Sequence, residues 1–253
     1  QGEESSYSPT MPITDIGYFS AGISSTGRLG AVPRRPALKG YTGRIHLVVA
    51  ETGNYALSHM VLNPEFGRRD RLVSDIVKGA SSYDGVQIDF EAIIPSDRAH
   101  FNDFIAELKK ALPKDKILSL ALPARRKTVE DAFSYRDLGA IADQIIIMSY
   151  DQHWSTSKPG PVSSLDWSLE VKRYARSQIP DAKIIYGVPF YGRAWVDRNP
   201  ARAYRLKQVP DVIAAKNSSV NRTKDGIPYT QFTDTVQVTM YYDDVDSFSK
   251  RIA

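Results

Sequence analysis

The chain of 253 residues contains no cysteine. This absence excludes a disulfide framework and a metal site built on thiolates. Its four histidines are dispersed and show no paired spacing typical of metal ligands, so we expect no metal and no other cofactor. The sequence also lacks any apolar run that approaches the roughly 18 residues needed to cross a bilayer, and it therefore predicts no membrane span.

Charge of one sign is not concentrated anywhere in the chain. The formal charge is +4 and the pI is near 9.1, but lysine and arginine are scattered among acidic residues. This pattern does not favour a nucleic-acid partner. Residues 1–9 are polar and lack the apolar core of a secretion signal, so an exported form would have lost its signal before this point.

Six apolar runs of strand length alternate with helical patterns, which is typical of repeated βα units in a parallel sheet. The helical patterns cover 68–82, 96–112 and 165–179, and Ser96 is the expected N-cap of the second. The strand runs are residues 13–21, 44–51, 85–91, 117–123, 144–150 and 183–190.

The pattern predicts an α/β fold of the TIM-type (β/α)8 barrel class, in one domain over residues 1–253. Such a barrel needs eight strands, and only six are visible. Residues 196–233 are polar and irregular, and they are interpreted as a small insertion. The apolar run 236–242 follows directly and is assigned to the same insertion rather than to a seventh barrel strand.

The segment 85–91 carries the strongest chemical signal. Side chains of a strand alternate between its two faces, so Gln87, Asp89 and Glu91 should project together into the barrel. The Cα atoms of Asp89 and Glu91 should lie roughly 7 Å apart, so that their charges interact and one carboxyl resists ionisation. Glu91 ends the strand at the edge where barrel enzymes place their active sites. The alternative is a buried polar cluster that only links strands.

Several ordered motifs resemble the family 18 glycoside hydrolases, the chitinase family. Residues 84–91 (DGVQIDFE) resemble its Asp-Gly-x-Asp-x-Asp-x-Glu signature. Residues 147–151 (IMSYD) resemble its Met-x-Tyr-Asp strand, and residues 186–195 are similar to its Gly-x-Pro-x-Tyr-Gly-Arg strand. Residues 13–29 resemble its second barrel strand. The ending Tyr-Asp-x-His-Trp at 150–154 is closest in pattern to bacterial peptidoglycan N-acetylglucosaminidases of the spore-cortex-lytic type.

The resemblance implies a TIM barrel whose first and eighth strands lie outside residues 1–253, with the insertion 196–233 after strand seven. In the family a tryptophan of the eighth strand forms the floor of the sugar site, and no residue of this sequence can be assigned that role. The resemblance also implies a monomer that acts outside the cell, in the periplasm or at the cell envelope.

The resemblance further implies substrate-assisted hydrolysis with retention at β-1,4 bonds next to N-acetylglucosamine. Glu91 would act as general acid, and Asp89 would accept a hydrogen bond from the acetamido N–H of the sugar. Tyr150 would hold the acetamido oxygen. Gln87 stands where many family members have aspartate; it can orient Asp89 but cannot share its proton.

The remaining candidate residues are expected to bind the sugar chain. Asp151 and Arg193 would contact sugar hydroxyls by family position, although they can equally form a structural ion pair. Aromatic rings near a barrel mouth are natural platforms for sugars, whereas Trp167 fits a helical core position. The proposed substrate-binding residues are Gln87, Asp151, Trp154, Tyr191, Arg193 and Trp195.

The partner expected from these residues is a polysaccharide containing N-acetylglucosamine, either peptidoglycan or a chitin-like glycan. Three cations at 125–127 follow a barrel strand and favour acidic peptidoglycan over neutral chitin, unless they form only a solvated loop. One rival is a lectin-like barrel that binds sugar without turnover. A barrel acting on phosphorylated metabolites is a second rival, but no glycine-rich phosphate loop follows the late strands.

Overall fold

The computed structural model describes residues 4–196, 201–233 and 237–252. These residues divide into two compact units. Unit 1 comprises the described residues up to 123, together with 128–147 and 176–185. Unit 2 comprises 124–127, 148–175 and the described residues from 186 onward. Each unit is built around its own sheet.

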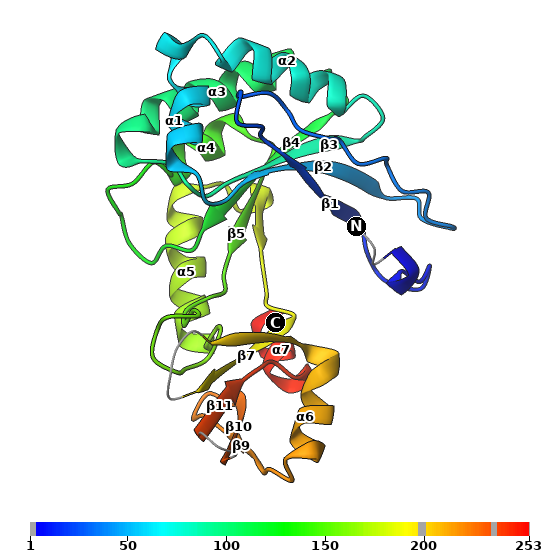
Figure 1. The fold of residues 1–253 in the computed structure, drawn as a ribbon, viewed down its shortest axis with the longest axis vertical. Helices are drawn as coiled ribbons and strands as arrows, with labels where there is room; N and C mark the ends of the chain where they lie inside the picture. Colours follow the sequence, from blue (N-terminus) through cyan, green and yellow to red (C-terminus); the bar gives the residue numbers. More distant parts are fainter. Residues whose placement is uncertain (1–3, 197–200, 234–236, 253) are drawn as a thin grey trace. The chain divides into compact units, whose positions relative to one another are not determined.

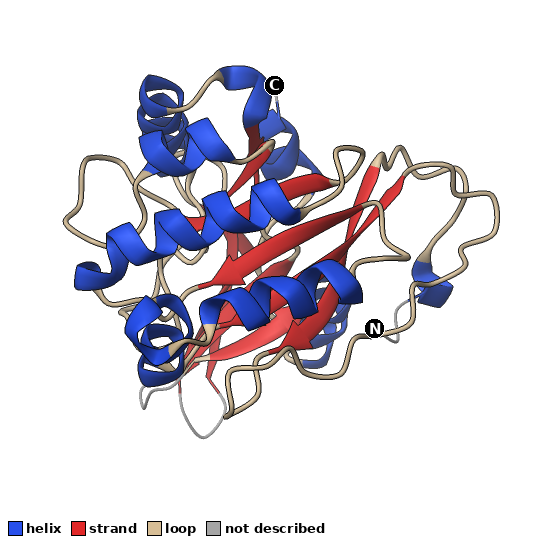
Figure 2. Cartoon of the chain, turned by 90° about the horizontal axis from the view of Figure 1, so that it is seen from above, coloured by secondary structure: helices blue, strands red, loops and turns tan. Residues whose placement is uncertain are grey.

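The larger sheet has six strands in the order β1-β2-β3-β4-β5-β6. The pairs β1/β2, β2/β3 and β3/β4 are parallel, as the alternation of strands and helices predicts. Helices α1 to α4 gather on one face of strands β1–β4 (Figures 1 and 2). The strands are β1 (Asp15–Gly22), β2 (Arg44–Glu51), β3 (Gly85–Phe90), β4 (Ile117–Pro123), β5 (Gln144–Met148) and β6 (Ile184–Tyr186).

Two of the helices in unit 1, α2 and α3, carry an apolar stripe of buried residues. The helical pattern predicted over 96–112 is confirmed by α3, whose residues Phe101, Phe104, Ile105 and Leu108 are all at most 1% exposed. Phe90 of β3 stacks on Phe104, with ring centroids 5.6 Å apart. The helices are α1 (Tyr55–Leu62), α2 (Arg69–Gly79), α3 (Arg98–Ala111), α4 (Tyr135–Ile141) and α5 (Leu165–Gln178).

The start of α3 differs from the sequence expectation. Ser96 does not cap this helix, because Pro95–Asp97 forms a short 3-10 turn and α3 begins at Arg98. Asp97 occupies the N-cap position, but its side chain makes no capping hydrogen bond to a backbone N–H of the helix. Its buried carboxylate instead contacts the Nδ1 atom of His59 at 2.9 Å. The tertiary partner of Asp97 therefore overrides the local capping preference.

The six predicted strands are present, but the last run is divided. Residues 183–190 contain only the short strand β6, and the next strand, β7 (Tyr191–Val196), belongs to a different sheet. The described residues thus supply a parallel sheet of six strands. Closure into an eight-stranded barrel, with first and eighth strands outside this chain, stays a prediction.

The second sheet, in unit 2, has five strands in the order β8-β7-β11-β10-β9, and its pairs are antiparallel. The interpretation of 196–233 as irregular is wrong for most of its described residues, which form strands and the helix α6 (Figure 1). Residue 236 lies outside the described residues, but 237–241 join this sheet as expected. The further elements are β8 (Arg202–Arg205), α6 (Val209–Ala215), β9 (Val220–Arg222), β10 (Pro228–Thr233), β11 (Gln237–Tyr241) and α7 (Val245–Ile252).

Candidate active site

Asp89 lies near the C-terminal end of β3, in the middle of the parallel sheet. Its neighbour in register on β2 is Ala50, a small residue that leaves space beside the carboxyl group. Only 6% of Asp89 is exposed, and its Oδ1 atom has no hydrogen-bond partner. A buried carboxyl oxygen without a donor is costly. Asp89 therefore carries a buried oxygen whose capacity to accept a hydrogen bond is unsatisfied.

Glu91 follows β3 directly and continues the face that carries Asp89. Its backbone N–H donates to the carbonyl of Glu51 at the end of β2, at 2.9 Å, which fixes the chain at this point. The residue itself is exposed. Burial and, second, the charge of Glu91 raise the pKa of Asp89 to about 6. The raised pKa marks Asp89 as a carboxyl that resists ionisation, and part of the rise comes from the charge of Glu91.

Gln87 lies one step earlier on the same face of β3. Its Oε1 atom reaches across the sheet to Gly17 of β1, where an added Cβ atom would lie 3.1 Å from it. The same Cβ would lie 3.3 Å from Val48 of β2. Glycine at position 17 thus leaves room for the Gln87 side chain where it lies, and a larger residue would require a neighbour to shift. No local sequence pattern marks this role of Gly17, because it depends on the register of β1, β2 and β3.

Unit 2 holds a second polar cluster, formed by Asp151, Tyr191 and Arg193. The Oδ1 atom of Asp151 accepts a hydrogen bond from Tyr191 at 2.6 Å and another from Arg193 at 2.7 Å. Burial and the bond to Asp151 raise the pKa of Tyr191. Asp151 has a φ of 55°, a left-handed conformation that aspartate tolerates better than most residues. Asp151 and Arg193 thus form the ion pair that was the alternative to sugar binding, and their predicted contact with sugar hydroxyls stays a prediction.

The aromatic side chains of unit 2 differ in their exposure and contacts. The ring of Tyr150 meets that of Tyr191 edge to face, with centroids 6.3 Å apart. Trp154 is 53% exposed and offers an open ring. Trp195 is 2% exposed and packs against Tyr241, so its burial does not fit the predicted role as a stacking platform. Trp167 is half-buried on α5.

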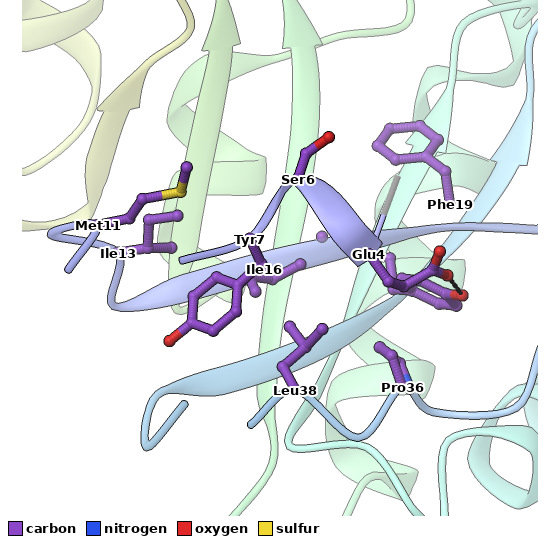
Figure 3. Close-up of a pocket in the computed structure, with 11 residues that line it drawn as sticks. Glu4, Ser6, Tyr7, Met11, Ile13, Ile16, Phe19, Pro36 and Leu38 are labelled. Carbon is purple, nitrogen blue, oxygen red and sulfur yellow. Dashed lines mark hydrogen bonds between the residues drawn. The ribbon is translucent and has the colours of Figure 1, made fainter. Parts of the chain in front are cut away.

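A pocket of about 430 Å³ lies along β1 in unit 1 (Figure 3). Residues 16–19 of β1 form one wall, and residues of the segment 4–13 together with Pro36 and Leu38 complete it. Tyr18 donates a hydrogen bond to Glu4 at its side. The lining is mostly apolar and includes none of Gln87, Asp89 and Glu91. The pocket is therefore separate from the carboxylate pair of β3.

The described residues contain neither a metal-binding cluster nor a membrane-spanning helix. No group of three or more histidine, aspartate or glutamate side chains there could hold a metal ion. In the same part of the chain, no helix has the length and apolar character required to cross a membrane.

The chain is similar in sequence to known bacterial proteins. YdhD of Bacillus subtilis (strain 168) is 32% identical over 179 residues, which cover 68% of this chain and 40% of YdhD. The cortical fragment-lytic enzyme of the same organism is 27% identical over 243 residues, which cover 88% of this chain and 56% of that enzyme. The chain thus spans about half the length of these curated relatives.

Solved structures of a spore cortex-lytic enzyme and of a chitinase are also similar to this chain. The spore cortex-lytic enzyme SleL of Bacillus cereus superposes with a TM-score of 0.83 at 25% identity, covering 94% of this chain and 60% of that one. A chitinase from Chromobacterium violaceum ATCC 12472 gives a TM-score of 0.82 at 25% identity, covering 92% and 80%. The sequence model of the glycosyl hydrolases family 18 matches residues 51–253. The chain therefore belongs to glycosyl hydrolase family 18.

Proposed function

We propose that this protein hydrolyses β-1,4 glycosidic bonds next to N-acetylglucosamine, with retention and with assistance from the substrate. The observation that carries the proposal is the pair on β3: a buried Asp89 whose Oδ1 atom lacks a donor, and an exposed Glu91 on the same face. The exposed carboxyl of Glu91 can reach a glycosidic oxygen, and the buried carboxyl of Asp89 can accept a hydrogen bond from an N–H group. An acetamido sugar supplies both partners.

The proposed reaction proceeds in two steps. The carboxylic acid of Glu91 donates its proton to the glycosidic oxygen, and the bond between this oxygen and the anomeric carbon breaks. The acetamido carbonyl oxygen of the sugar bonds to the anomeric carbon from the other side. Asp89 accepts a hydrogen bond from the acetamido N–H. The Glu91 carboxylate then takes a proton from water, whose oxygen displaces the acetamido oxygen. Two inversions give net retention, and no enzyme nucleophile is used.

The cluster of unit 2 is proposed to bind sugar hydroxyls. Asp151 is half-exposed, with 42% of its side chain accessible, although it already accepts bonds from Tyr191 and Arg193. The second carboxylate oxygen, Oδ2, can accept a hydrogen bond from a sugar hydroxyl. Trp154 is proposed as a stacking platform because its ring is exposed. Tyr150 is proposed to hold the acetamido oxygen, by family position.

Peptidoglycan at the cell envelope or outside the cell is the proposed substrate, rather than chitin. Relatives named cortical fragment-lytic enzyme and spore cortex-lytic enzyme support this choice. The basic segment 125–127 contributes less than its sequence implies, because Arg126 pairs with Glu170 at 2.7 Å. Lys127 is exposed and can attract carboxylates of the polymer. Rates on purified peptidoglycan and on chitin oligomers test the choice; faster chitin cleavage would refute it.

Replacing Glu91 with glutamine tests the enzymatic proposal against a lectin-like role. Glutamine keeps the shape of the side chain but has no transferable proton, so release of reducing ends from peptidoglycan should fall at least about a thousandfold. Binding to the same polymer should persist. The matched control is Glu130→Gln, which changes an exposed carboxylate elsewhere in unit 1. A wild-type protein that binds the glycan without releasing reducing ends would instead be a lectin.

A further inference from the structure

The loop 151–164 of unit 2 carries a histidine that the proposed reaction does not use. His153 is partly buried and comes directly before Trp154, the proposed stacking platform. Its Nδ1 atom lies 2.8 Å from the carbonyl oxygen of Pro161. A carbonyl oxygen only accepts hydrogen bonds, so Nδ1 must carry a proton and donate it. This bond ties residue 153 to the far end of the loop.

The ring of His153 also packs directly on the backbone of Gly160. A Cβ atom added at Gly160 would lie 2.5 Å from each ring nitrogen of His153, which is too close for atoms that are not bonded. The backbone of Gly160 is not left-handed, so alanine would be opposed by the ring and not by its own conformation. Glycine at position 160 therefore makes room for the ring.

Two hydrogen bonds of the preceding residue close the loop at the same place. The backbone N–H of Gln152 donates to the carbonyl of Val162 at 2.8 Å. The side-chain oxygen of Gln152 accepts a hydrogen bond from the backbone N–H of Ser164 at 2.7 Å. Residues 152 and 153 are thus both held against residues 160–164, immediately before Trp154.

Trp154 is exposed, but its orientation is fixed by its own hydrogen bonds. The residue is 53% exposed, and its indole Nε1 atom donates to the hydroxyl of Thr156 at 2.9 Å. Its carbonyl accepts a hydrogen bond from the backbone N–H of Ser157 at 3.1 Å. An exposed side chain that is mobile loses freedom when it binds a ligand, and this loss weakens binding. A ring that is already held has less freedom to lose.

We propose that His153 is a positioning residue for glycan binding and that it acts through Trp154. Its bond to Pro161 and its contact with Gly160 hold the chain before the tryptophan, while Thr156 holds the indole. The ring face is then presented to a sugar in one orientation. This inference rests on the proposed function, which assigns sugar stacking to Trp154, but the rigidity of the indole can be measured without sugar.

NMR relaxation of the indole N–H of Trp154 in the full chain tests the positioning. The signal is assigned by its absence from Trp154→Phe. In wild type its order parameter should be about 0.85, the value of a rigid backbone, and His153→Ala should lower it below about 0.6. Gly160→Ala should have the same effect, because the added methyl group displaces the ring of His153. Lys158→Ala, which truncates an exposed side chain of the same loop, is the control.

An indole that is equally rigid in wild type, His153→Ala and Gly160→Ala would overturn the proposal, whether or not the protein binds sugar. The two substitutions act on one contact. Adding Gly160→Ala to His153→Ala should therefore change the order parameter no further, because the ring that the methyl group would displace is gone. A further fall in the double variant would contradict the assigned contact.

Affinity for a sugar shows through which residue His153 acts. A tetramer of N-acetylglucosamine is titrated by calorimetry into chains that carry Glu91→Gln, so that it is not cleaved. His153→Ala should weaken binding about three- to tenfold, the cost of immobilising one side chain. Trp154→Ala should weaken it at least as much, and His153→Ala added to Trp154→Ala should change it by less than about twofold.

An equal loss of affinity from His153→Ala with and without Trp154 would overturn the proposal, because His153 would then act on the sugar or on the whole unit. If the Glu91→Gln chain binds no tetramer, the proposed function fails instead. The order parameters of the indole then decide the positioning role of His153 by themselves.

Discussion

Asp89 and Glu91 lie two residues apart on one face at the end of β3, and the exposed carboxylate acts on the buried one. Burial is the larger cause, and the charge of Glu91 the second, of a pKa of about 6 at Asp89. The pair can therefore retain one proton at a pH where isolated carboxyls are ionised. The pKa of Asp89 and its effect on stability can both be tested without a substrate.

The first prediction concerns the charge of Glu91. Glu91→Gln removes the neighbouring negative charge while Asp89 stays buried, so the pKa of Asp89 should fall below about 6 but stay above 3.8. The carboxyl carbon of labelled aspartate, followed by NMR as a function of pH, reports this shift. Glu130→Gln should leave the titration unchanged. An unchanged Asp89 pKa in Glu91→Gln would show that the two charges do not interact.

The second prediction concerns stability and pH. The folded-state pKa of Asp89 is raised from 3.8, so the folded state binds the proton more tightly. The stability from this group is fully present below about pH 4 and is lost as the pH rises through about 6. Asp89→Asn cannot ionise, and relative to wild type it should gain about 2 to 3 kcal/mol between pH 4 and pH 8. Urea unfolding of both proteins at both pH values checks this, and a constant difference would contradict it.

The third prediction tests the space around Gln87. Gly17→Ala places a Cβ atom 3.1 Å from the Gln87 Oε1 atom and 3.3 Å from Val48, so one side chain must move. The free energy of unfolding should fall by roughly 1 to 3 kcal/mol, as for other overpacked sites. Gly22→Ala is the control in the same strand, because nothing lies within 4 Å of its added Cβ. Equal effects of the two substitutions would show that Gly17 does not accommodate Gln87.

The fourth prediction concerns the cluster of unit 2. Asp151→Ala leaves Arg193, whose side chain is only 12% exposed, without its acceptor, and it places alanine at a φ of 55°. We expect a loss of about 1 to 3 kcal/mol in the free energy of unfolding. Asp181→Ala removes the partner of Arg176 in an exposed pair and should cost less than about 1 kcal/mol. Similar losses would show that the Asp151 cluster is ordinary surface structure.

Local sequence predicted the parallel strands and the carboxylate face of β3 because both follow from short periodic patterns. The alternation of Gln87, Asp89 and Glu91 with buried apolar residues is visible within seven positions. The fit between Gln87 and Gly17 is not, because it depends on how β1 and β3 align across β2. Such long-range register leaves no local signal.

The lack of a local signal for long-range contacts also explains why the sequence predictions for Trp195 and for residues 196–233 were wrong. Trp195 has the alternation of a site residue, but pairing of β7 with β11 brings Tyr241 against its ring and buries it. Strand β9 has three exposed residues, so no apolar period marks it in the sequence. Helix α6 is also short, with one buried residue, Val209. Elements that bury so little can be recognised only from their tertiary contacts.

The stereochemistry of the first product tests the central claim most directly. If Asp89 orients the acetamido group while Glu91 acts first as acid and then as base, wild-type protein must release the β-anomer of the new reducing sugar before mutarotation. Proton NMR of the anomeric signals, recorded within the first minutes of cleavage of an N-acetylglucosamine oligomer, measures this. Early accumulation of the β-anomer is the predicted result, and early accumulation of the α-anomer would contradict the account.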